Sequence, residues 1–72
     1  MTGKSESWAM VNGERRPVPA GATLVDLVVS LGLEPERVAV ELDREIVKRD
    51  RWAATSVVAG AVVEIVQFVG GG

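Results

Sequence analysis

The amino-acid sequence predicts an α+β domain in which a mixed sheet of four to five strands packs against one main helix. Three observations lead to this prediction. Runs in which apolar and polar residues alternate occur near both ends of the chain and in its second half, and such alternation is typical of half-buried strands. One stretch, residues 23–32, instead repeats its apolar residues at helical spacing. A chain of 72 residues has room for a single small core.

The beginning of the chain predicts a polar extension followed by a hairpin. Residues 1–7 (MTGKSES) are polar and lack periodicity, so we expect a disordered extension and a first strand that starts at Trp8. The Asn-Gly pair at 12–13 suits a type I′ turn between two short strands. Pro17 and Pro19 cannot donate hydrogen bonds to a neighbouring strand, which confines the second strand to a sheet edge or cuts it short.

Residues 23–32 predict the main helix, with about two turns. Thr23 is a good N-cap, Asp26 stands where a capping box needs its acidic partner, and Gly32 occupies the position after the last turn. One helical face carries the apolar residues Leu24, Leu27, Val28 and Leu31.

Two or three further strands are expected after Pro35. Residues 38–42 alternate as a half-buried strand, and residues 45–47 are long enough for a short fourth strand after a weak turn at Asp43-Arg44. Residues 61–69 predict the last and longest strand. Its alternation places Val63 and Ile65 on one face, and on the other face Glu64, Val66 and Phe68.

The predicted order of elements, β-β-α-β-(β)-β, has a known solution. One helix must cover the core face of the sheet, so the N-terminal hairpin and the last strand are expected to form the middle of a mixed sheet. This arrangement is the β-grasp, or ubiquitin-like, roll. The chain then divides into a disordered extension at residues 1–7, a β-grasp domain at 8–69 and a flexible glycine tail at 70–72.

The composition argues against catalysis by this chain alone. It has no Cys and no His, and therefore no disulfide, none of the common zinc ligands and no usual nucleophile–base pair. We expect the remaining acidic residues to form a solvated surface, namely Glu34, Glu36, Glu41, Asp43 and Glu45. No catalytic residue and no metal site is predicted.

Charge and hydropathy limit the classes of partner and the cellular location that we expect for the chain. The net charge is −2 and the Lys and Arg residues are dispersed, which argues against nucleic-acid binding. No apolar stretch approaches the roughly 20 residues that span a bilayer, and the polar start does not resemble a signal peptide. We therefore expect a cytoplasmic protein without membrane or nucleic-acid partners.

The terminal glycines are the one feature that the fold does not require. Gly70, Gly71 and Gly72 follow the last strand without a polar linker. Residues without side chains can enter a narrow slot. The Gly72 carboxylate is thus predicted to reach an active site in another protein, where it is activated as an acyl-adenylate and accepts a nucleophile. The alternative is that these glycines are a flexible end or a cloning remnant.

From about Met10 to Gly72 the chain resembles the ThiS family, the small β-grasp sulfur carriers of thiamin biosynthesis. The matching stretches are VNGERRPVPAGATLVDLV, VAVELDREIVKRDRWA and VEIVQFVGGG. The Arg-x-x-Trp motif at 49–52 and the terminal Gly-Gly are the most specific parts. The chain departs from the family pattern in two turns, where Asp43-Arg44 replaces Asn-Gly and Gly60-Ala61 replaces Gly-Asp.

This resemblance implies a carrier that binds no cofactor and is acted on by other enzymes. A ThiF-type, E1-like adenylyltransferase would use ATP and Mg²⁺ to convert the Gly72 carboxylate to an acyl-adenylate. A persulfide sulfur donor would then displace AMP and leave a thiocarboxylate, which thiazole synthase (ThiG) would use as its sulfur source.

Partner docking is expected beside the tail. If Val63 and Ile65 face the helix, then Val66 and Phe68 are exposed next to the glycines. Glu64 then points to the same outer side as Val66 and Phe68. These three outward residues are the predicted docking site. The alternative is that Phe68 folds back over the sheet edge.

Two residues of the Arg-x-x-Trp motif carry separate expectations. Trp52 is expected to close the bottom of the core, with a partner contact as the second interpretation. Arg49 either clamps a loop or is merely solvated.

Two other functions remain open from the sequence. The small subunit of molybdopterin synthase (MoaD) and other ubiquitin-like carriers share the fold and the Gly-Gly end, although the segment ELDREIVKRDRW favours ThiS. A ubiquitin-like module that binds a partner non-covalently through its sheet face is the other possibility.

Overall fold

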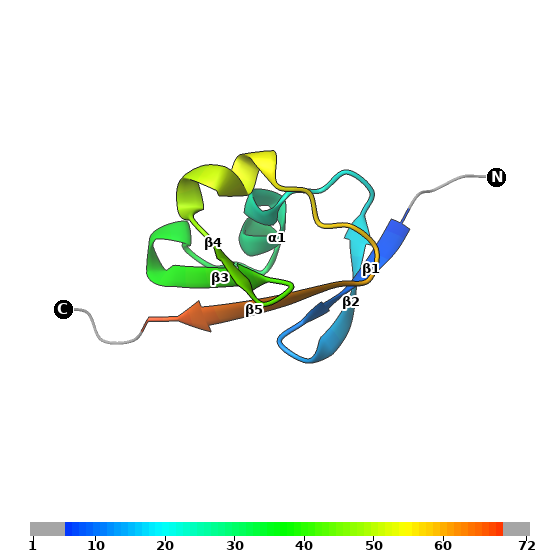
Figure 1. Cartoon of the computed structure of the whole chain (residues 1–72), viewed down its shortest axis with the longest axis horizontal. Coiled ribbons are helices and arrows are strands. Elements are labelled where there is room, and N and C mark those ends of the chain that lie inside the picture. Colours follow the sequence, from blue (N-terminus) through cyan, green and yellow to red (C-terminus); the bar gives the residue numbers. More distant parts are fainter. Residues whose placement is uncertain (1–5, 69–72) are drawn as a thin grey trace.

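A five-stranded mixed sheet, in the order β2-β1-β5-β3-β4, packs one face against a single α-helix (Figure 1). This computed structural model describes residues 6–68. The strands are β1 (Glu6–Val11), β2 (Glu14–Pro19), β3 (Val38–Leu42), β4 (Glu45–Val47) and β5 (Ala61–Gln67). The helix is α1 (Leu24–Ser30), and two 3₁₀ helices, η1 (Pro35–Arg37) and η2 (Arg49–Ala54), complete the fold. The architecture is the predicted β-grasp roll.

The N-terminal hairpin turns where the sequence predicts it but begins earlier. Asn12 and Gly13 have φ values of 52° and 82°, the positive pair that a type I′ turn requires. β1 starts at Glu6, so the prediction that residues 6 and 7 belong to a disordered extension is wrong. The reason is register: β2 continues to Pro19, which pairs with Glu6, and Ser7 pairs with Val18. Residues 1–5 of the predicted extension lie outside the described residues.

Both ends of α1 are capped as predicted. The Thr23 hydroxyl accepts from the Asp26 N–H at 3.3 Å, and the Asp26 carboxylate accepts from the Thr23 N–H at 2.9 Å, which completes a capping box. At the other end, Gly32 has a φ of 75° and donates to the Val29 carbonyl, while Leu33 donates to the Val28 carbonyl. These two bonds form a Schellman motif, so the helix stops at a position that only a glycine adopts without strain.

The sheet order corrects one expectation about the hairpin. β5 is the central strand, parallel to β1 and antiparallel to β3. Only β1 of the hairpin reaches the middle of the sheet, because β2 lies at the edge. Edge placement is what the two prolines of β2 require, since their nitrogens cannot donate to a further strand.

The β3–β4 turn, which the sequence marks as weak, is anchored on β5. Asp43 and Arg44 have φ values of 51° and 74°, a left-handed geometry that is costly for residues with side chains. The Asp43 N–H donates to the Val62 carbonyl at 2.7 Å, and the Asp43 carboxylate accepts from the Val62 N–H at 3.0 Å. These two bonds offset the strain that an Asn-Gly turn would avoid.

The core lies between the sheet and the helices and is aliphatic except for one tryptophan. Its largest fully buried side chains are Trp52, Leu24, Val28, Val40 and Val63. Trp52 is 1% exposed, and its indole N–H donates to the Val47 carbonyl at 2.8 Å. It therefore closes the core under η2, as predicted. Within the described part of the chain, no helix is long and apolar enough to cross a membrane.

Candidate functional site

The central strand β5 leads directly toward the predicted reactive end. Its last residue is Gln67, and the Phe68 N–H then donates to the Arg37 carbonyl at 2.8 Å. In Figure 1, the arrowhead of β5 points away from the β1–β2 hairpin. The chain is thus held by backbone hydrogen bonds up to Phe68. Residues 69–72, which include the predicted site at Gly72 and the tail residues Gly70 and Gly71, lie outside the described residues.

The alternation predicted for β5 is confirmed. Val63 and Ile65 are buried, whereas Glu64, Val66 and Phe68 are exposed. Phe68 retains 56% of its surface and Val66 retains 60%. Such exposure favours an outward Phe68 over a phenylalanine folded back over the sheet edge. The three predicted docking residues are therefore accessible beside the end of β5.

The face of the sheet that α1 leaves uncovered, here called the outer face, carries more apolar side chains than the sequence reasoning assigned to docking. Ala9 and Val11 of β1 point into the core, so Trp8 and Met10, which alternate with them, point outward. By the same alternation, Val62 and Val66 of β5 and Ile46 of β4 also belong to this face. All five are exposed large hydrophobic residues. Their period-2 spacing was visible in the sequence, but their grouping depends on the strand order.

Two acidic residues lie opposite each other on the outer face. Glu41 of β3 and Glu64 of β5 are register partners in the antiparallel pair. The next pair toward β4 joins Glu41 to Ile46. The sequence predicts a solvated position for Glu41 and a docking role for Glu64, but no local pattern places the two side by side.

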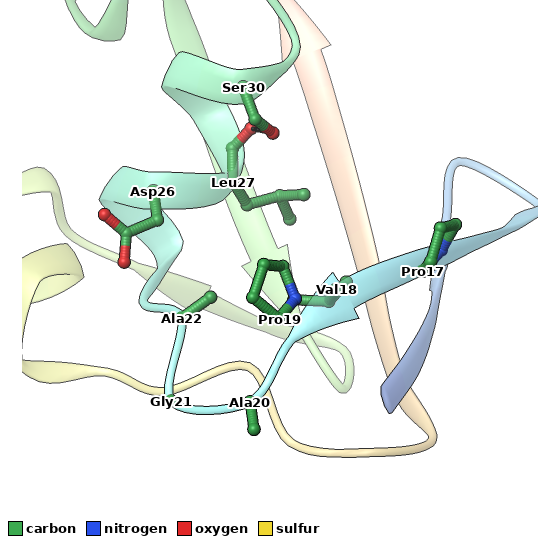
Figure 2. A pocket seen from close by; sticks show the side chains of 9 residues that line it. All are labelled: Pro17, Val18, Pro19, Ala20, Gly21, Ala22, Asp26, Leu27 and Ser30. Carbon is green, nitrogen blue, oxygen red and sulfur yellow. Dashed lines mark hydrogen bonds between the residues drawn. The ribbon is translucent and has the colours of Figure 1, made fainter. Parts of the chain in front are cut away.

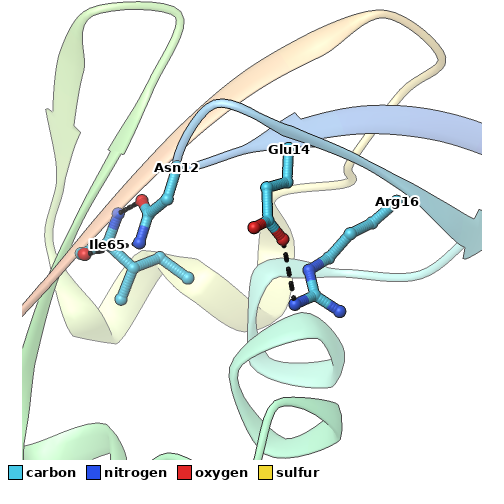
Figure 3. Close-up of polar contacts among 4 residues, drawn as sticks. All are labelled: Asn12, Glu14, Arg16 and Ile65. Carbon is cyan, nitrogen blue, oxygen red and sulfur yellow. Dashed lines mark hydrogen bonds and ion pairs between the residues drawn. The ribbon is translucent and has the colours of Figure 1, made fainter.

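Asn12 is a positioning residue for β5, a role beyond the turn position that the sequence predicts for it. Its carboxamide oxygen accepts from the Ile65 N–H at 2.7 Å, and its amide group donates to the Ile65 carbonyl at 3.1 Å (Figure 3). Its backbone N–H also donates to the Val63 carbonyl at 2.9 Å. The β1–β5 pairing ends at Val63, so the side chain acts as one further strand residue. It holds the half of β5 that leads to the tail.

We predict that Asn12→Ala destabilises the domain by about 2–3 kcal/mol, since it removes the two hydrogen bonds between the Asn12 side chain and the Ile65 backbone and leaves a residue with a Cβ at positive φ. Asn12→Gly is the matched control, because it tolerates the turn geometry but lacks the carboxamide. Urea unfolding measures the free energy of unfolding of both variants, and the difference between the two values isolates the backbone strain. The Ile65 amide should exchange its hydrogen faster in both variants; unchanged exchange in Asn12→Gly would contradict the bracing role.

A hollow lies elsewhere, between β2 and α1. Figure 2 shows its apolar wall, which includes Val18, Pro19 and Leu27, and two polar side chains at its rim, Asp26 and Ser30. Its volume is about 380 Å³. Both polar groups are engaged within the helix, because Asp26 caps the Thr23 N–H and the Ser30 hydroxyl donates to the Leu27 carbonyl at 2.8 Å. The hollow therefore has little free polar chemistry to orient a ligand.

Other predicted residues take structural or solvated roles. The Arg49 side chain is exposed and makes no hydrogen bond or ion pair among residues 6–68, which agrees with the solvated interpretation. The same part of the chain contains no cluster of three acidic residues that could hold a metal ion. The arrangement thus offers an accessible face and a strand that leads to the tail.

Comparison with known proteins finds relatives of the family that the sequence resembles. The ThiS family model matches residues 9–72. The sulfur carrier protein ThiS of Bacillus subtilis is 35% identical over 72 residues, which cover 100% of this chain and 96% of that protein. A thiazole synthase of Magnetococcus marinus is 40% identical over 62 residues, which cover 86% of this chain but only 19% of that protein.

The solved structures agree. The crystal structure of the thiamine biosynthesis protein ThiS from Geobacter metallireducens superposes with a TM-score of 0.76 at 34% identity, covering 90% of this chain and 99% of that one. The match therefore extends over sequence, length and fold, and the chain belongs to the ThiS family.

Proposed function

We propose that this chain is a sulfur carrier protein whose Gly72 carboxylate is converted to a thiocarboxylate that supplies sulfur for the thiazole ring of thiamin. The observation that carries the proposal is the match to the Bacillus subtilis sulfur carrier, which spans this entire chain, the terminal glycines included. The family match, which reaches residue 72, supports the same assignment.

The proposed chemistry divides the work between this chain and its partners. A ThiF-type adenylyltransferase binds ATP and Mg²⁺, and the Gly72 carboxylate attacks the α-phosphate with release of pyrophosphate. A persulfide sulfur of the donor then attacks the acyl carbon and AMP leaves. A thiol reduces the resulting acyl disulfide and forms a disulfide with the donor sulfur, so that the carrier keeps the terminal sulfur as its thiocarboxylate. The carrier supplies the electrophile and contributes no catalytic residue.

A thiazole synthase is the proposed client. The Magnetococcus marinus relative bears that name, and a segment similar to this chain makes up 19% of it. A carrier-like segment within a thiazole synthase favours this client over molybdopterin synthase. Since the cycle needs ATP and a persulfide donor, we place it in the cytoplasm.

We further propose that both partner enzymes dock beside the tail on Val66, Phe68 and Glu64. Glu64 and Val66 are exposed on β5, and Phe68 is exposed directly after its last residue, on the side of the glycines. An exposed aromatic residue flanked by an aliphatic one is a typical anchor of a protein interface.

Replacing Phe68 with alanine is expected to raise the KM for adenylation about tenfold with little change in kcat, because the anchor contributes to docking and not to the chemistry. Val58→Ala is the matched control. Val58 is 61% exposed, but it lies before the start of β5, at the end of the strand that is away from the tail. Steady-state release of pyrophosphate measures both variants. Equal KM values for Phe68→Ala and the wild-type chain would remove Phe68 from the docking site.

The proposed function is tested by intact-protein mass spectrometry. The chain is incubated with MgATP, the adenylyltransferase of the same genome and a persulfide donor, and it should gain the mass difference between sulfur and oxygen. Addition of thiazole synthase and its substrates should return the original mass, whereas the large subunit of molybdopterin synthase should not. An unchanged mass with enzymes that convert the Bacillus subtilis carrier would refute the proposal.

A further inference from the structure

We propose that the outer face of the sheet docks a partner protein that places one arginine side chain between Glu41 and Glu64, within an otherwise apolar contact. This inference rests on the proposed function, because the partner is an enzyme of the sulfur-transfer cycle. It goes beyond docking at the tail, since it extends the interface across β5, β3 and β4 and specifies the chemistry at its centre.

The first observation is the geometry of the two carboxylates. Glu41 and Glu64 are direct register partners on adjacent antiparallel strands, and the Cβ atoms of such a pair lie about 4.5–5.5 Å apart. Both belong to the outer face, because the neighbouring pair formed by Val40 and Ile65 points into the core. Like charges in this position disfavour the strand pairing. The folded chain thus keeps an arrangement that weakens its own sheet.

The second observation is that neither carboxylate forms an ion pair with another residue that the structure describes. The ion pairs among residues 6–68 join Arg16 to Glu14 and Arg37 to Glu34. One arginine of the described strands, Arg15, does lie on the outer face, but its guanidinium carbon sits 4.0 Å from the centre of the Trp8 ring. Arg15 belongs to the edge strand β2, which is separated from β5 by β1. Within the described part of the chain, the acidic pair therefore lacks an ion-pair partner.

The third observation is the apolar surround. Val62 and Val66 flank Glu64 along β5, Ile46 is the register partner of Glu41 on β4, and Ala39 is the register partner of Val66. Val66 and Ile46 remain 60% and 75% exposed. A partner that covers these side chains must also remove water from the two carboxylates between them.

Desolvation selects the chemistry of the partner. Two carboxylates that lose water without a counter-charge are strongly unfavourable, so an apolar partner surface alone does not fit this face. A planar guanidinium offers several N–H donors and can bond both carboxylates at once, which a single ammonium group does less well. The face is therefore complementary to an apolar surface with an arginine at its centre.

The test uses the variants Glu41→Gln, Glu64→Gln and their combination, with Glu45→Gln as the matched control. Glu45 is an exposed acidic residue of β4 that pairs with Leu42, so its side chain belongs to the opposite face of the sheet. All single variants change the net charge equally. In the free chain, each of the first two variants should raise the Tm by about 2–4 °C, because each removes the like-charge contact. Glu45→Gln should leave the Tm unchanged.

Whereas the variants should be more stable, their affinity for the partner enzyme should be lower. Calorimetric titration with the adenylyltransferase, and separately with thiazole synthase, is done without ATP so that docking is measured apart from tail chemistry. With at least one enzyme, the double variant should bind about tenfold more weakly and lose much of the salt dependence of the Kd. Glu45→Gln should bind as the wild-type chain does. Higher stability combined with weaker binding is a result that a merely structural role would not produce.

Several outcomes would overturn the inference. These are an unchanged Kd of the double variant for both enzymes, an equal loss in Glu45→Gln, or no measurable binding of the wild-type chain to either enzyme. Self-association of the wild-type chain that the double variant loses, seen by sedimentation, would assign the face to a second copy instead. The proposed function fails separately: a chain that gains no sulfur but binds through the acidic pair refutes the carrier role alone, and a converted chain with unaffected variants refutes this inference alone.

Discussion

Deletion of Gly72 is expected to lower the rate of thiocarboxylate formation at least about a hundredfold while leaving the Tm unchanged. The shortened chain still ends in a glycine carboxylate, because Gly70 and Gly71 remain. Only the reach of that group changes, by about 3.5 Å for one extended residue. A displacement of about 1 Å from the reactive geometry is enough to cost about a hundredfold in rate. Single-turnover formation of the adenylate, followed by intact mass, measures the effect.

Two control variants separate reach from side-chain bulk. A chain with one added glycine carries its carboxylate too far and should fail as the deletion does. Gly72→Ala keeps the length but adds a methyl group, so its defect reports how closely the partner surrounds the tail. Wild-type rates in the deletion variant would place the reactive carboxylate elsewhere and contradict the proposed site.

Trp52→Ala is expected to lower the free energy of unfolding by about 3–5 kcal/mol, the range for truncating a buried aromatic side chain. Trp52 is 1% exposed and is the largest fully buried side chain. A domain of this size has a total stability near the lower end of about 5–15 kcal/mol. A considerable fraction of the variant should therefore be unfolded at 37 °C. Urea unfolding followed by far-UV circular dichroism provides the measurement.

The comparison with Trp52→Phe divides this loss into two parts. Phenylalanine keeps most of the apolar volume but cannot donate to the Val47 carbonyl, which the indole N–H reaches at 2.8 Å. We expect a loss of about 1–2 kcal/mol from the missing hydrogen bond and the smaller ring. A loss below about 1 kcal/mol in Trp52→Ala would show that η2 does not depend on this side chain.

The elements that depend on neighbouring residues were predictable from the sequence. Thr23 and Asp26 cap the helix through contacts three residues apart, and Gly32 ends it at a positive φ. The Asn12-Gly13 turn needs only the conformational preferences of its own two residues. The alternation along β5 likewise separated Val63 and Ile65 from the outward side chains. The fold class and the three docking candidates follow from such local rules.

The start of β1 was missed because it depends on the partner strand. Glu6 and Ser7 are polar and carry no strand signal of their own. They are ordered into β1 because β2 extends to Pro19 and offers them register partners. Local composition therefore marked an extension where pairing produced a strand.

The sequence by itself determined which residues form the helix, the turns and the inward side of β5, because short-range geometry decides each of these. Only the tertiary structure decided that β5 lies between β1 and β3, that Asn12 bonds Ile65 across 53 positions, and that Glu41 faces Glu64. These contacts depend on strand order and register, which result from packing the whole sheet against one helix. No local pattern records which distant strand becomes a neighbour, and the outer face exists only once those neighbours have met.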